Sequence, residues 1–149
     1  MMSQDPSSES VDVLFVEDNP GDVRLAEEAF KEIEISVDLE SVHRGQNALE
    51  YLHERYERED ESRPDVILLD LHLPDMDGME ILEELKETQG LESIPVIVLT
   101  NSQDVNHMSK SLEKDALAYF AKPFDPDGYD ELAHSLASFF IDIAYPVEE

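Results

Sequence analysis

The chain has 149 residues, 41% of them hydrophobic, so it has the length of one domain and enough apolar side chains for a core. It carries 37 acidic and 10 basic side chains, a net charge of −27, which excludes nucleic acid and anionic membranes as favoured partners. Cysteine is absent, which excludes disulfides, thiolate metal sites and a cysteine nucleophile, and no apolar run approaches the ~18 residues of a membrane span.

Strand-length apolar runs alternate with helix-period segments along the chain. The first half predicts a strand at 11–16, a helix at 22–30, a strand at 37–42, and a helix that begins at Gly45 and ends in the charged stretch 53–63. The second half predicts a strand at 66–71, a helix carrying Met79, Leu82 and Leu85, a strand at 95–99, a weaker helix at 104–114, a short strand at 118–121, and a last helix from about 127 or 130 to 143.

Strict alternation of strands and helices predicts parallel strands joined by right-handed crossovers. Five such units predict an α/β fold: a doubly wound five-stranded parallel sheet of order 2-1-3-4-5, with helices on both faces. We expect one domain at 11–144, a disordered N-terminal tail at 1–10, and a short C-terminal tail at 145–149 with no output domain.

The composition also predicts the setting in which the protein works. The polar segment 1–10 lacks the basic and apolar regions of a signal peptide, so we expect a soluble, cytoplasmic protein. Repulsion within an acidic coat weakens in concentrated salt, where the screening length falls from ~10 Å at 0.1 M to ~3 Å at 1 M. The charge therefore favours a halophilic protein over an ordinary acidic one, and the periodic apolar pattern argues against disorder.

Acidic side chains end two of the predicted strands. Asp70 closes an apolar run, and Glu17 and Asp18 close the run 11–16. Ligands bind at the carboxyl ends of strands in open parallel sheets, and the predicted order puts the first and third strands side by side. The three carboxylates should therefore converge. Two charges ~4 Å apart repel by about 4 kcal/mol at an effective dielectric of 20, so the cluster needs protons or a cation unless solvent screens it.

The residue types in this cluster favour Mg²⁺, which takes carboxylate oxygens and often a phosphate, and there is no histidine–cysteine cluster for zinc. Lys122 follows the strand 118–121 and supplies the positive charge that a phosphoryl group beside Asp70 would need. Thr100, at the end of the fourth strand, could donate to a phosphoryl oxygen or cap a helix. Tyr119 could equally be a half-buried core aromatic.

Four motifs, in this order, resemble the receiver domain of two-component response regulators, a flavodoxin-like fold. They are Glu17-Asp18-Asn19-Pro20, the run from Leu68 to Gly78, Val98-Leu99-Thr100, and Lys122-Pro123-Phe124. The resemblance covers residues 11 to about 140. It implies that Asp70 accepts a phosphoryl group from a histidine kinase, with no enzyme activity beyond self-catalysed phosphorylation and dephosphorylation.

The resemblance also implies the roles of the surrounding residues. Mg²⁺ would be held by Glu17, Asp18, Asp70 and the backbone carbonyl of His72, and Lys122 would contact the acyl phosphate. Thr100 and Tyr119 would form a switch that reshapes the face of helix four, strand five and helix five. The side chains of His72 and Ser102 would tune the rate at which water hydrolyses the acyl phosphate, in a direction that the sequence does not give.

Narrower features resemble stand-alone receivers that partner phytochrome-type or other sensor histidine kinases. They are the start Glu17 to Asp22, the charged insert before Arg63-Pro64-Asp65, and the aromatic end Phe139-Phe140…Tyr145-Pro146. Some members of that group dimerise, so a homodimer is a candidate assembly. The downstream protein target is not given by the sequence.

Other functions compete with a terminal switch. A relay protein that passes the phosphoryl group onward, or a receiver-like module that binds partners without phosphorylation, stays open. A haloacid-dehalogenase-like phosphohydrolase would carry an Asp-x-Asp motif after a strand, with the second aspartate as general acid. This chain has His72 in the place of that second aspartate. A flavodoxin-like cofactor binder would need a Ser/Thr/Gly-rich phosphate loop after the first strand, and three acids there would repel a flavin phosphate.

Overall fold

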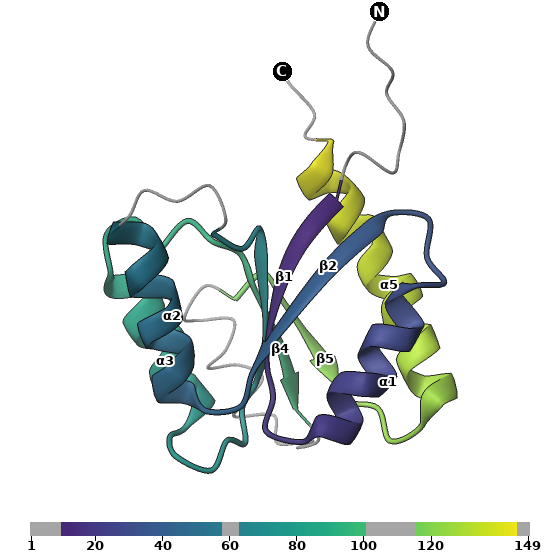
Figure 1. The fold of residues 1–149 in the computed structure, drawn as a ribbon, viewed down its shortest axis with the longest axis horizontal. Helices are drawn as coiled ribbons and strands as arrows, with labels where there is room; N and C mark the ends of the chain where they lie inside the picture. Colours follow the sequence, from purple (N-terminus) through teal and green to yellow (C-terminus); the bar gives the residue numbers. More distant parts are fainter. Residues whose placement is uncertain (1–9, 58–62, 101–115, 146–149) are drawn as a thin grey trace, which may run out of the picture.

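A five-stranded parallel sheet forms the middle layer of the computed structural model, which describes residues 10–57, 63–100 and 116–145 (Figure 1). Its strands are β1 (Ser10–Val16), β2 (Ser36–Val42), β3 (Val66–Asp70), β4 (Val96–Thr100) and β5 (Ala118–Ala121). They lie in the order β2-β1-β3-β4-β5, and every neighbouring pair is parallel. The predicted α/β fold and strand order are confirmed.

Helices cover both faces of the sheet. They are α1 (Pro20–Phe30), α2 (Gly45–Glu57), α3 (Gly78–Glu87) and α5 (Pro126–Ala144). Figure 1 shows α1 and α5 on one face and α2 and α3 on the other. The helix predicted at 104–114 and most of the predicted tails lie outside the described residues.

Each central strand sends alternate side chains into two separate cores, because successive residues of a strand point to opposite faces. On the α1/α5 side the buried strand residues are Val11, Val13, Phe15, Val66, Leu68, Ile97 and Leu99. On the α2/α3 side they are Leu14, Val16, Ile67, Leu69, Val96 and Val98. Burial on both faces explains why these strands read as uninterrupted apolar runs. The edge strand β2 has no fully buried residue, which explains its weaker pattern.

Two helices begin earlier than the apolar periodicity predicts, because polar caps and prolines set their first turns. Asn19 accepts hydrogen bonds from the N–H groups of Gly21 and Asp22, so α1 begins at Pro20 rather than at residue 22. Asp125 accepts from the N–H of Gly128 in the same way, and α5 begins at Pro126. On α5, Phe140 is the fully buried phenylalanine, and Phe139 is half-buried.

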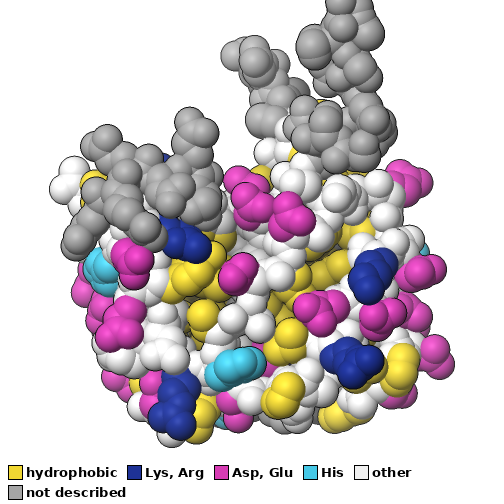
Figure 2. Space-filling model, in the orientation of Figure 1, with side chains coloured by type: hydrophobic (Ala, Val, Ile, Leu, Met, Phe, Trp, Pro, Cys, Tyr) yellow, Lys and Arg dark blue, Asp and Glu magenta, His cyan; other side chains and the backbone are white. Residues whose placement is uncertain are grey.

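On the face that Figure 2 shows, acidic side chains stand at many separate places, with lysine and arginine side chains between some of them. None of the helices in the described ranges has both the length and the apolar character needed to cross a bilayer.

Candidate functional site

Three carboxylates converge at the carboxyl end of the sheet. Glu17 directly follows β1, and Asp70 is the last residue of β3, the neighbouring strand. One oxygen from each of Glu17, Asp18 and Asp70 lies within 4.8 Å of the other two. Glu17 is fully buried and Asp70 is 2% exposed, whereas Asp18 is open to solvent. The structure therefore brings together the three acids that the strand order predicts to meet.

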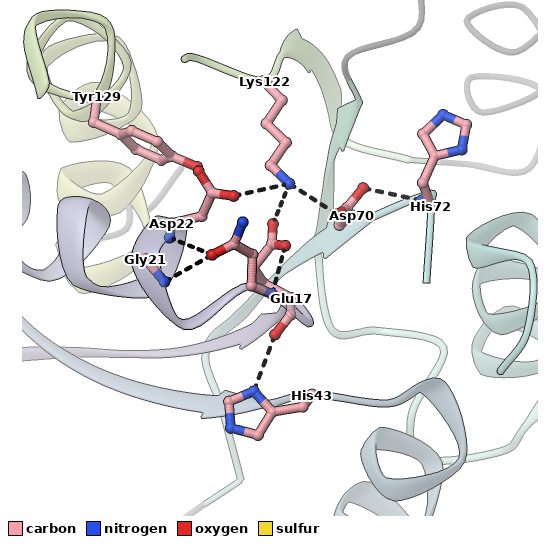
Figure 3. A network of polar contacts seen from close by, with 9 residues as sticks. Glu17, Gly21, Asp22, His43, Asp70, His72, Lys122 and Tyr129 are labelled. Atoms are coloured by element: carbon pink, nitrogen blue, oxygen red, sulfur yellow. Dashed lines mark hydrogen bonds and ion pairs between the residues drawn. The ribbon is translucent and has the colours of Figure 1, made fainter. Parts of the chain in front are cut away.

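Lys122 stands among these carboxylates. Its Nζ lies 2.8 Å from Glu17 Oε1 and 3.1 Å from Asp70 Oδ2, and the side chain is only 13% exposed (Figure 3). The backbone explains the placement: Lys122 directly follows β5, and its N–H donates to the carbonyl of Thr100 at the end of β4. A lysine at the end of one strand is thus directed toward an aspartate at the end of another.

The site holds more negative than positive charge, and its burial makes that imbalance unfavourable. Burial raises the pKa of Glu17 to about 7, and the charge of Asp70 acts in the same direction, against the attraction of Lys122. Burial opposes the charge on Lys122, but contacts with Glu17 and Asp70 outweigh it and raise the pKa of that ammonium. Lys122 therefore stays charged near neutral pH, yet one lysine does not balance the acids around it.

The donor set fits a divalent cation. Glu17 Oε1 is buried and lies 2.8 Å from the ammonium of Lys122, which leaves its remaining lone pair for another partner. Asp18 and Asp70 add two more hard oxygen atoms, and the exposure of Asp18 leaves room for water. Oxygen ligands with open positions are what Mg²⁺ and similar ions take in phosphoryl-transfer sites. The cluster could therefore bind a divalent metal ion.

The loop after β3 is held in place by its own backbone and by α2. The N–H of His72 donates to Asp70 Oδ1 at 2.9 Å. Asp75 accepts from the N–H groups of Gly45 and Gln46, at 2.9 and 3.0 Å, and so ties the loop to the first turn of α2. These contacts fix the backbone on both sides of His72.

Glycine is required where α3 begins. A Cβ on Gly78 would come within 2.6 Å of the Leu71 Cα and 2.8 Å of the Asp70 carbonyl oxygen. The start of α3 therefore packs directly on the backbone of Asp70, which accounts for the glycine that closes the motif.

The other predicted site residues are on β4, on β5 and in the loop after β3. Thr100 is fully buried at the end of β4, and Tyr119 is half-buried in β5 and packs against the α2/α3 core. The imidazole of His72 is exposed and lies apart from the carboxylates in Figure 3. Ser102 lies outside the described residues.

Two residues that extend the contacts of Lys122 were not predicted as site residues. Asp22, in the first turn of α1, places Oδ2 3.3 Å from Lys122 Nζ, and Tyr129 of α5 donates from its hydroxyl to Asp22 Oδ1 at 3.2 Å. Asp22 belongs to the motif that follows β1, so a search for acids near that motif could have found it. No sequence signal marks Tyr129, because its position depends on how α5 packs against α1.

Comparison with known proteins identifies this arrangement of strands and charged residues. Residues 13–134 match the family model of the response regulator receiver domain. The chain belongs to this family. Its acidic cluster and Lys122 lie at the carboxyl ends of the strands of a receiver fold, and the predicted resemblance is confirmed at the level of the family.

Among its relatives, the chain is similar to the response regulator Rcp1 of Synechocystis sp., with 35% identity over 130 residues that cover 87% of this chain and 88% of Rcp1. The crystal structure of the phosphorylated cyanobacterial phytochrome response regulator RcpA matches with a TM-score of 0.80 and 32% identity, over 93% of this chain and 99% of RcpA. The Mn²⁺-bound form of Rcp1 matches with a TM-score of 0.78 and 33% identity, over 93% and 97% of the two chains.

Proposed function

We propose that this response regulator accepts a phosphoryl group on Asp70 from a sensor histidine kinase and signals through contacts with other proteins. The observation that carries the proposal is the setting of Asp70, which is 2% exposed, 3.1 Å from the ammonium of Lys122, and clustered with Glu17 and Asp18. A carboxylate in that position has a cation to orient it and hard oxygen atoms beside it to hold a metal ion.

In the proposed reaction an Asp70 oxygen attacks the phosphorus atom of a phosphohistidine. A P–O bond forms, the P–N bond breaks, and the imidazole nitrogen that leaves takes up a proton. Positioning and charge stabilisation supply most of the catalysis in such transfers, and the N–H groups of Lys122 would donate to the phosphoryl oxygens. Attack of water on the acyl phosphate regenerates Asp70 and releases inorganic phosphate, and we propose no enzyme activity beyond these two steps.

Mg²⁺ is the cofactor we propose for this site. Glu17, Asp18, Asp70 and the backbone carbonyl of His72 would hold it, and when bound it would neutralise charge on the transferring phosphoryl group. The oxygen atoms of Glu17, Asp18 and Asp70, which lie within 4.8 Å of one another, support a cation at this site, and the Mn²⁺-bound Rcp1 structure supports a divalent ion.

Thr100 and Tyr119 are the residues we propose for the switch. The place of Thr100 at the end of β4, the strand next to β3, supports a contact between its hydroxyl and phosphorylated Asp70, and Tyr119 on β5 would then turn into the space left. The output face would be made by β5, α5 and the helix predicted at 104–114. The side chains of His72 and Ser102 stay candidates for tuning hydrolysis.

The partners and setting follow from relatives and composition. Similarity to a phytochrome response regulator supports a phytochrome-type kinase as the donor, and the charge of −27 supports work in the cytoplasm of a cell rich in salt. A homodimer stays a prediction, supported by the exposed Ile141 and Tyr145 near the end of α5. A phosphorelay role, which passes the group onward, is the alternative to a terminal switch.

The test is intact-mass analysis after incubation with acetyl phosphate and Mg²⁺ in 1 M KCl, with acid quenching at short times. The wild type should gain one phosphoryl group, and the gain should disappear with EDTA and in Asp70→Asn. Asp65→Asn, directly before the first residue of the same strand, is the matched control and should be phosphorylated normally. An unmodified wild type with an intact circular dichroism spectrum would favour a phosphorylation-independent binding module.

A further inference from the structure

A chain of polar contacts leads from Lys122 to helix α5. The two oxygens of Asp22 have different partners: Oδ2 lies 3.3 Å from Lys122 Nζ, and Oδ1 accepts from the Tyr129 hydroxyl at 3.2 Å (Figure 3). One carboxylate thus bridges the site to a side chain of α5. Rotation of that carboxylate would disturb both contacts.

Asp22 is the third carboxylate around the ammonium of Lys122. A lysine ammonium has three N–H donors, and here three carboxylates stand at 2.8, 3.1 and 3.3 Å. Glu17 and Asp70 draw Nζ toward the sheet, whereas Asp22 draws it toward α1. The position of Nζ beside Asp70 therefore depends on where Asp22 is held.

Tyr129 is suited to hold Asp22. Its side chain is 1% exposed and is packed in the core between the sheet, α1 and α5. A hydroxyl buried in this way needs a hydrogen-bond partner, and Asp22 supplies one. Burial, followed by the charges of Asp22 and Glu17, raises the pKa of Tyr129, so the phenol stays protonated and remains a donor.

We infer that Tyr129 and Asp22 act together as positioning residues that hold Lys122 in place for phosphoryl transfer to Asp70. The inference rests on the proposed function, since Lys122 is positioned for that reaction. It assigns a role in the chemistry to a core tyrosine of α5, a helix that contributes no other residue to the site among the described residues.

The test is Tyr129→Phe, which removes one hydroxyl and changes no charge. Pseudo-first-order rate constants for phosphorylation by acetyl phosphate are measured at saturating Mg²⁺, and Mg²⁺ affinity is measured separately by titration. The rate constant should fall about 3- to 10-fold, the range expected for the loss of one hydrogen bond, with Mg²⁺ affinity unchanged within about twofold. Tyr51→Phe is the control, since it keeps the ring over Arg55 and lies on α2, away from the site.

A double-mutant cycle separates positioning from a general structural effect. In a Lys122→Ala background, Tyr129→Phe should cause no further loss, because the residue it acts through is gone. Asp22→Asn should also lower the rate, and adding Tyr129→Phe to it should have little further effect. If Tyr129→Phe fails to fold, the phosphorylation rates of Asp22→Asn, alone and in the Lys122→Ala background, test the positioning role instead.

Three results would overturn the inference. They are a wild-type rate in Tyr129→Phe, an equal fractional loss with and without Lys122, and a loss of rate matched by a loss of Mg²⁺ affinity. Phosphorylation of the wild type is measured first in the same experiment. A failure of the positioning role, with wild-type phosphorylation intact, is thereby distinguished from a failure of the proposed function.

Discussion

The raised pKa of Glu17 predicts that the metal-free protein becomes less stable as the pH rises from about 4.5 to about 7. In the unfolded chain Glu17 ionises near its ordinary value of 4.5, and in the folded protein near 7. Below pH 4.5 the carboxyl is protonated in both states and carries no penalty. Above pH 7 it is ionised in both, and the folded state bears the full cost of a buried, poorly balanced charge.

The size of this effect follows from the shift between the two states. Each pKa unit corresponds to 1.36 kcal/mol, so the move from 4.5 to about 7 corresponds to about 3 kcal/mol of unfolding free energy lost between pH 4.5 and 7. Against a total stability of ~5–15 kcal/mol, such a loss is readily measured.

The assay compares the wild type with Glu17→Gln, which keeps the shape and cannot ionise. Urea unfolding in 1 M KCl with EDTA, at several pH values from 4.5 to 8, gives the two free energies. Their difference should shift by about 3 kcal/mol in favour of the variant, because repulsion among the other acids cancels in the comparison. Glu27→Gln, an exposed position on α1, should show no such shift. A difference between wild type and Glu17→Gln that stays constant with pH would refute the reasoning.

Three further predictions concern the loop after β3 and the surface charge. Asp75→Ala should lower the unfolding free energy by about 1 kcal/mol, because Asp75 caps the first turn of α2. Asp142→Ala, on the exposed face of α5, is the control and should leave the unfolding free energy unchanged. Equal chemical denaturation curves for the two variants would contradict this prediction. Gly78→Ala should destabilise by ~1–3 kcal/mol and slow phosphorylation, because the new methyl group meets the backbone of Leu71 and Asp70; a wild-type melting temperature and rate would show that the loop yields freely. The melting temperature should rise by several degrees between 0.1 and 1 M KCl as charge repulsion is screened, and a melting temperature that does not change with salt would count against the proposal that the protein works in concentrated salt.

The parts of the site that strands control could be predicted from the sequence. Apolar runs buried on both faces mark β1, β3 and β4, and the parallel order then puts Glu17 and Asp70 at neighbouring strand ends. Lys122 follows by the same logic, because β5 pairs with β4 and ends at the same edge of the sheet. Strand order converts positions in the sequence into neighbours in space with little dependence on side-chain packing.

The parts controlled by helix packing could not be predicted in this way. Tyr129 meets Asp22 across 107 positions of sequence, and the contact depends on how α5 is rotated against α1. The polar caps at Asn19 and Asp125 also place the starts of both helices ahead of the apolar periodicity. Periodicity identifies a buried face but does not fix the rotation of one helix against another.

Lys122 connects the residues placed by strand order with those placed by helix packing, because it contacts both Asp70 and Asp22. Phosphorylation would replace the single negative charge of the Asp70 carboxylate with about −1.5 to −2 charges on the acyl phosphate, beside acids that already exceed the positive charge, so the ammonium would be drawn further toward Asp70. Asp22 makes the longest of the three contacts and is the one most readily given up. Its release would leave the buried Tyr129 hydroxyl bound to a carboxylate that no longer faces a cation.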